Sequence, residues 1–180
     1  MAISKEFKQQ ITDLPKEELA KIVITIAAKD NVFSEYIKLT YFNDEIDEND
    51  VFEDYKSKIH GLLLKRYKGY AEEEKAAHFI TACNKELTNF EKISKNKELL
   101  VSLILIVLEC AYTDLGARFC TCFTAYEYKF SLLLKKAIKI ITTKMHEDMI
   151  IEYREPINKF LNLIKTVRHL DYINALPKEI

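Results

Sequence analysis

Apolar side chains recur along this chain at intervals of three and four positions, the spacing that places them on one face of an α-helix. Leu19, Ile22, Val23 and Ile26 form one such stripe. Similar stripes follow one another over residues 1–180, with short polar connections between them. We therefore expect a single domain of about seven to nine antiparallel helices, packed either as an irregular bundle or as a HEAT-like α-α superhelix.

The scarcity of glycine and proline supports the same fold class. The chain contains three glycines and three prolines among 180 residues, whereas an average protein carries roughly 7% glycine and 5% proline. The tight turns of a sheet depend on both residue types, and a parallel α/β fold needs short loops that end in glycine caps. The sequence therefore predicts an all-α fold.

Several single residues indicate where helices begin, end or bend. Asp30 and Ser94 each stand before an apolar stripe and are typical N-cap residues. Gly61 lies inside a predicted helix and suggests that another helix crosses closely there. Pro156 interrupts the last predicted helix, residues 147–175, and we expect two helical pieces that meet at this proline.

The longest apolar stretch, Leu99–Leu108, is interrupted only by Ser102. A helix that is apolar on every side must be surrounded by protein, so we expect a central helix near residues 97–113. The stretch rises about 15 Å as a helix, half of a bilayer core, and does not predict a membrane span. Met1–Gln10 lacks the apolar core of a signal peptide, so we expect a cytoplasmic protein with free thiols.

The charge is unevenly distributed, although the net charge is only −1. The first 60 residues carry 13 acidic and 8 basic side chains, whereas the last 60 carry 7 acidic and 10 basic ones. The basic C-terminal third leaves binding of RNA or DNA open as a third hypothesis. Because neither a concentrated basic face nor a glycine-rich phosphate loop accompanies it, the pattern does not favour a nucleic-acid partner.

Cys110, Cys120 and Cys122 are the candidates for a metal site. Zinc ligands usually come as Cys-x-x-Cys or Cys/His pairs that converge on the ion, whereas helical residues two apart point about 200° away from each other. The alternative is that these thiols pack as small apolar side chains. No histidine has an acidic residue three positions before it, as di-iron bundles require, and we expect no cofactor.

Glu109 is the acidic residue that ends the apolar run. A buried carboxylate needs a partner or takes up a proton. One hypothesis is therefore a helical bundle with a central polar pocket that binds a small ligand or metal, or an enzyme that uses Glu109 with Tyr112, His78 or His169. The alternative is a structural ion pair or hydrogen bond, or exposure of Glu109 at the helix end.

Two stretches of the sequence, Leu14–Leu19 and Tyr55–Ile59, resemble a family of small bacterial all-helical proteins of unknown function. Residues 114–138 are similar to a later helix of that family. The tail of the family carries a glycine, an aromatic residue and then His-Asp, whereas Val167–Asp171 lacks the glycine and separates histidine from aspartate. The resemblance implies an all-helical fold over most of the chain and assigns no activity.

The absence of a catalytic constellation beside an aromatic-rich helical core leads to our favoured hypothesis. We expect a helical protein-interaction or scaffold module without catalytic activity. Its partner is another protein or a second copy, because the acidic N-terminal third and the basic C-terminal third are able to meet between copies. Exposed aromatic residues gathered in one groove would support this hypothesis.

Overall fold

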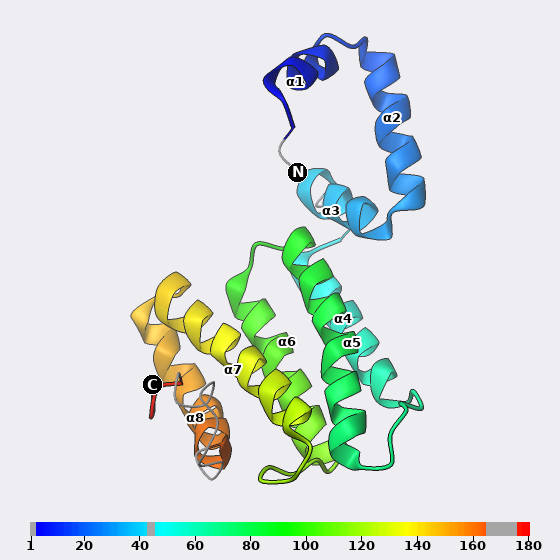
Figure 1. Cartoon of the computed structure of the whole chain (residues 1–180). Coiled ribbons are helices and arrows are strands. Elements are labelled where there is room, and N and C mark those ends of the chain that lie inside the picture. Colours follow the sequence, from blue (N-terminus) through cyan, green and yellow to red (C-terminus); the bar gives the residue numbers. More distant parts are fainter. Residues whose placement is uncertain (1–2, 43–45, 165–175) are drawn as a thin grey trace. The chain divides into compact units, whose positions relative to one another are not determined.

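The computed structural model describes residues 3–42, 46–164 and 176–180, and every regular element within these ranges is helical (Figure 1). The prediction of an all-α fold is therefore confirmed. The elements are α1 (Lys5–Thr12), α2 (Lys16–Lys29), α3 (Asn31–Tyr41), α4 (Glu48–Leu63), α5 (Glu72–Ile93), α6 (Lys97–Glu109), the π-helical turn η1 (Cys110–Asp114), α7 (Thr124–Lys144) and α8 (Glu147–Ile164).

The chain divides into two compact units, Met1–Asp47 and Glu48–Ile180. The N-terminal unit contains α1 to α3, and the C-terminal unit contains α4 to α8 with η1. Each unit is described by itself below. The single domain over residues 1–180 that the sequence suggests stays a prediction.

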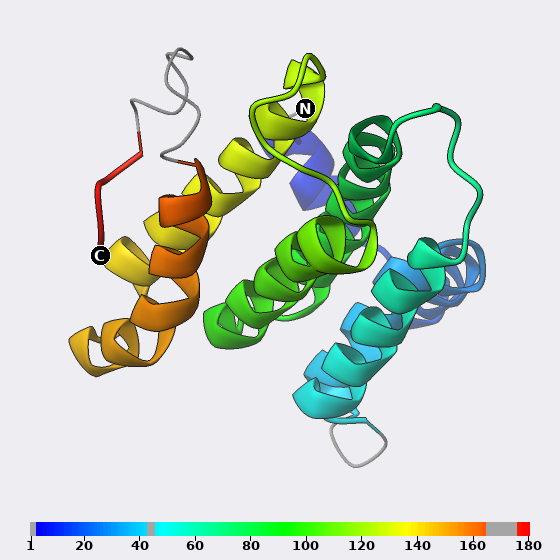
Figure 2. The same ribbon diagram turned by 90° about the horizontal axis from the view of Figure 1, so that it is seen from below.

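The apolar helix α6 is the centre of the C-terminal unit, as the sequence predicts. It packs against α4, α5 and α7, while α8 lies along α7 (Figures 1 and 2). Its buried side chains lie on one broad face of the helix: Leu100, Val101, Leu103, Ile104, Val107 and Leu108. The other apolar side chains, Leu99, Leu105 and Ile106, are half-buried. The helix takes the central place because it offers no polar face to water. Its last turn widens into η1, within the range predicted for the central helix.

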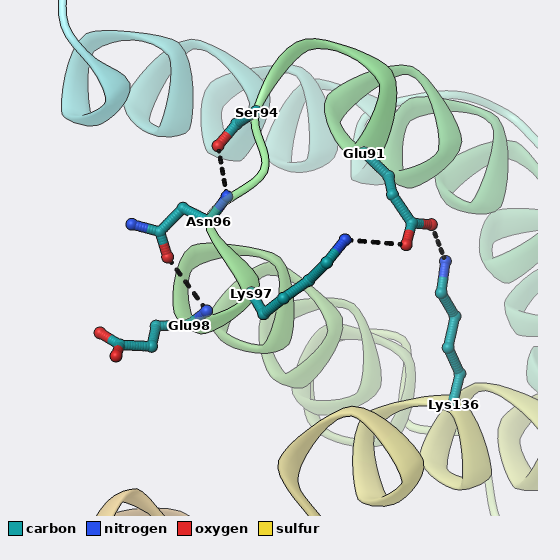
Figure 3. A network of polar contacts seen from close by, with 6 residues as sticks. All are labelled: Glu91, Ser94, Asn96, Lys97, Glu98 and Lys136. Atoms are coloured by element: carbon teal, nitrogen blue, oxygen red, sulfur yellow. Dashed lines mark hydrogen bonds and ion pairs between the residues drawn. The ribbon is translucent and has the colours of Figure 1, made fainter. Parts of the chain in front are cut away.

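The corner between α5 and α6 shows which residue caps the central helix (Figure 3). The Asn96 side-chain oxygen accepts hydrogen bonds from the backbone N–H groups of Glu98 and Leu99, at 3.1 and 3.2 Å. Ser94 was expected to be this cap, but it ends α5. Its hydroxyl accepts from the Asn96 N–H at 3.0 Å and donates to Glu48 of α4 at 2.7 Å. The prediction for Ser94 is wrong because this contact with α4 holds it two residues before the cap.

Glu91 links three helices at the same corner (Figure 3). Its carboxylate accepts from the ammonium groups of Lys97 on α6, at 3.2 Å, and Lys136 on α7, at 2.9 Å. Burial by itself raises the pKa of Glu91, but the hydrogen bonds and charges of the two lysines outweigh it and lower the pKa below its ordinary value. Glu91 therefore stabilises the packing of α5, α6 and α7 only while it is ionised.

Two further local expectations are wrong. Gly61 does not mark a close helix crossing, since a Cβ atom added there would meet nothing within 4 Å. Pro156 does not divide the last helix, because α8 continues through it from Glu147 to Ile164. The carbonyl that loses its hydrogen bond belongs to Glu152, an exposed position that water reaches. Residues 165–175 of the predicted last helix lie outside the described residues.

Truncation of the central helix should cost far more stability than truncation of an exposed side chain. Leu103 is fully buried on α6, whereas Leu132 on α7 is 46% exposed. We expect Leu103→Ala to lower the free energy of unfolding by about 3 kcal/mol, because it leaves a cavity that its neighbours fill only partly. Leu132→Ala should cost less than about 1 kcal/mol. Urea unfolding followed by circular dichroism measures both, and equal losses would contradict the central position of α6.

The contribution of Glu91 to the free energy of unfolding should depend on pH. Because its pKa is lowered in the folded state, its stabilisation is present above the ordinary pKa of about 4.3 and is lost as the pH falls through the folded value. We expect Glu91→Gln to reduce stability by about 1 kcal/mol at pH 7, with the difference from the parent shrinking below about pH 4.3 and vanishing below the lowered pKa of Glu91.

The matched control for this experiment is Glu53→Gln, which removes an exposed carboxylate paired with Lys56 on the same helix. Urea unfolding at several pH values should show little difference between this variant and the parent at any pH. A Glu91→Gln effect that stays constant from pH 7 to pH 3 would show that Glu91 does not act through its charge.

Candidate functional site

Glu109, the strongest catalytic candidate in the sequence, forms an ion pair between α6 and α8. Its carboxylate oxygens accept from the Lys159 ammonium at 2.9 and 3.1 Å and from the Thr113 hydroxyl at 2.7 Å. The hydrogen bond from Lys159 is the main reason that its pKa is lowered, and burial opposes this effect only partly. The Glu109 side chain is 44% exposed. It is a paired carboxylate at the end of α6 and not a buried acid.

The other predicted site residues have separate surroundings. Tyr112 lies in η1 and stacks on Phe119, with ring centroids 5.9 Å apart. His78 is exposed on α5 and lines a pocket of about 320 Å³, together with Cys122 and Lys129. Neither Glu109 nor Tyr112 lines that pocket. His169 lies outside the described residues.

The three cysteines proposed as metal ligands differ in their environments. Cys110 is buried in η1, and burial is the main cause that raises its pKa to about 12. Cys120 and Cys122 are exposed in the loop that follows. Across residues 3–42, 46–164 and 176–180, no three His, Cys, Asp or Glu side chains are placed so that they could hold a metal ion. The cysteines are therefore not assembled into a metal site within these ranges.

Residues 115–123 form a loop, although apolar residues at helical spacing over residues 119–144 predict a helix that begins at Phe119. The helix begins instead at Thr124. Cys120 has a φ of 65°, a left-handed value that a right-handed helix excludes. The backbone N–H of Cys120 donates to the Glu127 carboxylate at 2.6 Å, and this contact holds the loop against the first turn of α7.

A second buried carboxylate holds the same loop from another helix. Glu73 of α5 accepts from the backbone N–H of Arg118 at 3.1 Å. Glu73 and Glu127 are 9% and 1% exposed, respectively. The sequence analysis did not single them out, although each stands four positions before a buried residue of its own helix, Ala77 and Ser131. This position on a buried helix face is the signal that could have identified them.

Aromatic rings close the bundle beneath this loop. Phe119 stacks on Tyr126, with centroids 5.2 Å apart, and meets the edge of Phe130 at 5.1 Å. The Tyr126 hydroxyl is buried without a hydrogen-bond partner among the described residues, and burial raises the pKa of Tyr126. Because the hydroxyl is shielded from solvent, we assign this cluster to the packing of the loop.

The N-terminal unit differs sharply from this bundle, because none of its described residues is buried. Large apolar side chains stay exposed on all three of its helices and on the residues beside them. They are Ile3, Phe7, Ile11, Leu14, Ile22, Val23, Ile24, Ile26, Tyr41 and Phe42. Since an amphipathic helix gains most of its stability by burying its apolar face, this unit presents faces that are suited to packing against another surface.

A groove between α2 and α3 concentrates this exposed surface. It has a volume of about 550 Å³, and its lining consists of aliphatic and aromatic side chains: Val23, Phe33, Tyr36, Ile37, Tyr41 and Phe42. The two helices meet at Asp30, whose carboxylate accepts from the backbone N–H groups of Val32 and Phe33. Asp30 is thus the N-cap of α3, as the sequence predicts. We call this the N-terminal groove.

Comparisons with family models, with curated proteins and with solved structures found no match for this chain. Among the described residues, no helix is both long enough and apolar enough to cross a bilayer. The N-terminal groove is therefore judged by its own geometry. We take it as the candidate functional site because four of its six lining residues are aromatic and two of these, Tyr41 and Phe42, are 70% and 53% exposed.

Removal of the carboxylate that holds the loop should loosen residues 115–123. We expect Glu127→Ala to lower the free energy of unfolding by about 2 kcal/mol, because the Cys120 N–H loses its charged acceptor. Amide hydrogen exchange at Cys120 should become faster. Glu155→Ala, which removes an exposed carboxylate from α8, is the control and should leave both quantities unchanged. Unaltered exchange at Cys120 in Glu127→Ala would show that this hydrogen bond does not hold the loop.

Proposed function

We propose that this chain is a helical protein-interaction module that binds another polypeptide through its N-terminal groove. The observation that carries the proposal is the open groove lined by Phe33, Tyr36, Tyr41 and Phe42. Contiguous exposed apolar surface marks interaction sites on proteins, and aromatic side chains dominate the binding energy of interfaces. The groove gathers the exposed Tyr41 and Phe42 with the half-buried Phe33 and Tyr36, and this supports the favoured hypothesis from the sequence.

The shape and chemistry of the groove favour a helical ligand. Two packed helices with an apolar furrow between them are the usual receptor for an amphipathic helix, which inserts side chains spaced at i, i+3, i+4 and i+7. The lining of the N-terminal groove contains no charged side chain. Affinity would therefore come from apolar burial, with specificity set by the charged residues at its rim.

The competing hypothesis, a ligand-binding or catalytic bundle based on Glu109, has less support. Its acid is paired with Lys159, and the pocket beside His78 does not include Glu109. Catalytic acids are usually marked by a carboxyl pKa raised through burial or a neighbouring like charge. The pKa of Glu109 is instead lowered. This hypothesis stays a prediction, and the interaction module is our conclusion.

Site-specific photo-crosslinking in the producing cells tests the proposal. A benzoylphenylalanine residue in place of Tyr41, which is 70% exposed in the groove, should become attached to a second polypeptide on irradiation. The control places the same residue at Ile151 on α8, which is 68% exposed in the C-terminal unit. We expect a crosslinked band of higher mass for position 41 and none for position 151.

Two results would contradict the proposal. One is the absence of any crosslinked band at position 41. The other is a crosslink from position 41 to the C-terminal unit of the same chain, identified by peptide mass spectrometry, because it would show that the groove is covered from within. The identity of the crosslinked partner, read from the same band, does not change how this test is judged.

A further inference from the structure

We infer that the occupant of the N-terminal groove is α1 of a second copy of this chain, so that two copies exchange their first helices. This inference rests on the proposed function and names its partner. It follows from the presence of a groove and a matching helix in one small unit. In the structure, the helix does not occupy the groove of its own chain.

The exposed stripe on α1 has the spacing that a groove-binding helix needs. Phe7 and Ile11 stand at i and i+4 of α1 and are 52% and 37% exposed, and Leu14, two residues beyond the helix, is 36% exposed. The helix begins with its own cap, since the Ser4 hydroxyl accepts from the Phe7 N–H at 3.2 Å. It is thus a defined amphipathic helix whose two apolar anchors, Phe7 and Ile11, stay exposed.

The connection between α1 and α2 holds α1 away from the groove of its own chain. The turn is fixed by hydrogen bonds from Asp13 N–H to Gln9 O, at 3.0 Å, and from Leu14 N–H to Ile11 O, at 3.2 Å. Pro15 follows with its φ locked by the ring, and it restricts Leu14 before it. Of the three helices in this unit, α2 and α3 make the extensive contact (Figure 1).

The charges of this unit suit an interface between two identical copies. Residues 3–42 carry six basic and six acidic side chains. Two copies therefore meet without net repulsion. A strongly acidic or basic partner would have no comparable complement on this surface.

Reciprocal exchange also accounts for the number of copies. Each chain supplies one helix and one groove, so two copies related by a two-fold axis satisfy both, and the assembly closes. Each α1 would cover the aromatic lining of the other chain while its own stripe is buried in return. We therefore expect a dimer and no longer chain of copies.

Sedimentation equilibrium of the full chain tests this inference. It compares the parent with two single variants, Phe7→Asp in the helix and Tyr41→Asp in the groove. We expect the parent to be a dimer and each variant to dimerise at least about tenfold more weakly, because each places a charge in an apolar contact. Both residues are more than half exposed within one chain, so circular dichroism should show both variants folded. Ile151→Asp on α8 is the matched control and should remain dimeric.

A mixture of the two variants distinguishes helix exchange from any other dimer. A Phe7→Asp chain keeps its groove intact and a Tyr41→Asp chain keeps its helix intact, so the mixed dimer retains one complete contact. Reciprocal exchange therefore predicts that the mixture dimerises more tightly than either variant alone, and more weakly than the parent. A face-to-face dimer, in which each groove meets the other groove, predicts no such recovery.

Several outcomes would overturn the inference. They are a monomeric parent at all concentrations, a dimer that neither substitution weakens, and a mixture without recovery. If the parent is monomeric and position 41 crosslinks to a different protein, the inference fails while the proposed function stands. If position 41 gives no crosslink to any polypeptide, both fail.

Discussion

The need to enclose α6 governs the C-terminal unit. Its run from Leu99 to Leu108 offers no polar face, so stability requires helices on every side of it, and α4, α5 and α7 provide them. The polar contacts at its ends follow from this requirement. Asn96 satisfies the backbone at its start, and Glu109 ties its end to α8 through Lys159. Asn96 and Glu109 therefore stabilise the two ends of a buried helix.

The N-terminal unit, in contrast, leaves its apolar helix faces exposed. Its helices are amphipathic, yet each is too short to be stable in water without tertiary contacts, since isolated helices below about 12–15 residues are marginal. No described residue of the unit is buried, so the apolar faces of α2 and α3 gain little from each other. The missing burial has to come from a further surface. In this sense the interaction that we propose is a condition for the stability of the unit as well as its function.

The sequence predicted the fold where the determining contacts are local. Helical periodicity is local, and so is the cap at Asp30, which bonds to residues two and three positions later. Two of the failures involve partners that are distant in sequence. Ser94 is held by Glu48, and the start of α7 is delayed by a loop that bonds to Glu73, 45 positions before Arg118. No pattern within one helix contains this information, although a carboxylate on a buried face, such as Glu127, does signal that a partner is needed.

The candidate site was harder to predict for a related reason. Periodicity shows that Phe33, Ile37 and Tyr41 share a face of α3, but a covered stripe and an open stripe have the same spacing. The inventory of side chains alone also directs attention to acids, histidines and cysteines, because catalysis and metal binding use them. The structure shows these groups paired, buried as packing or dispersed, and it shows the apolar stripe open. An unusual polar residue beside an apolar run is thus explained by its contacts at the end of a helix. Ordinary apolar residues become informative once the structure shows that nothing within their own unit buries them.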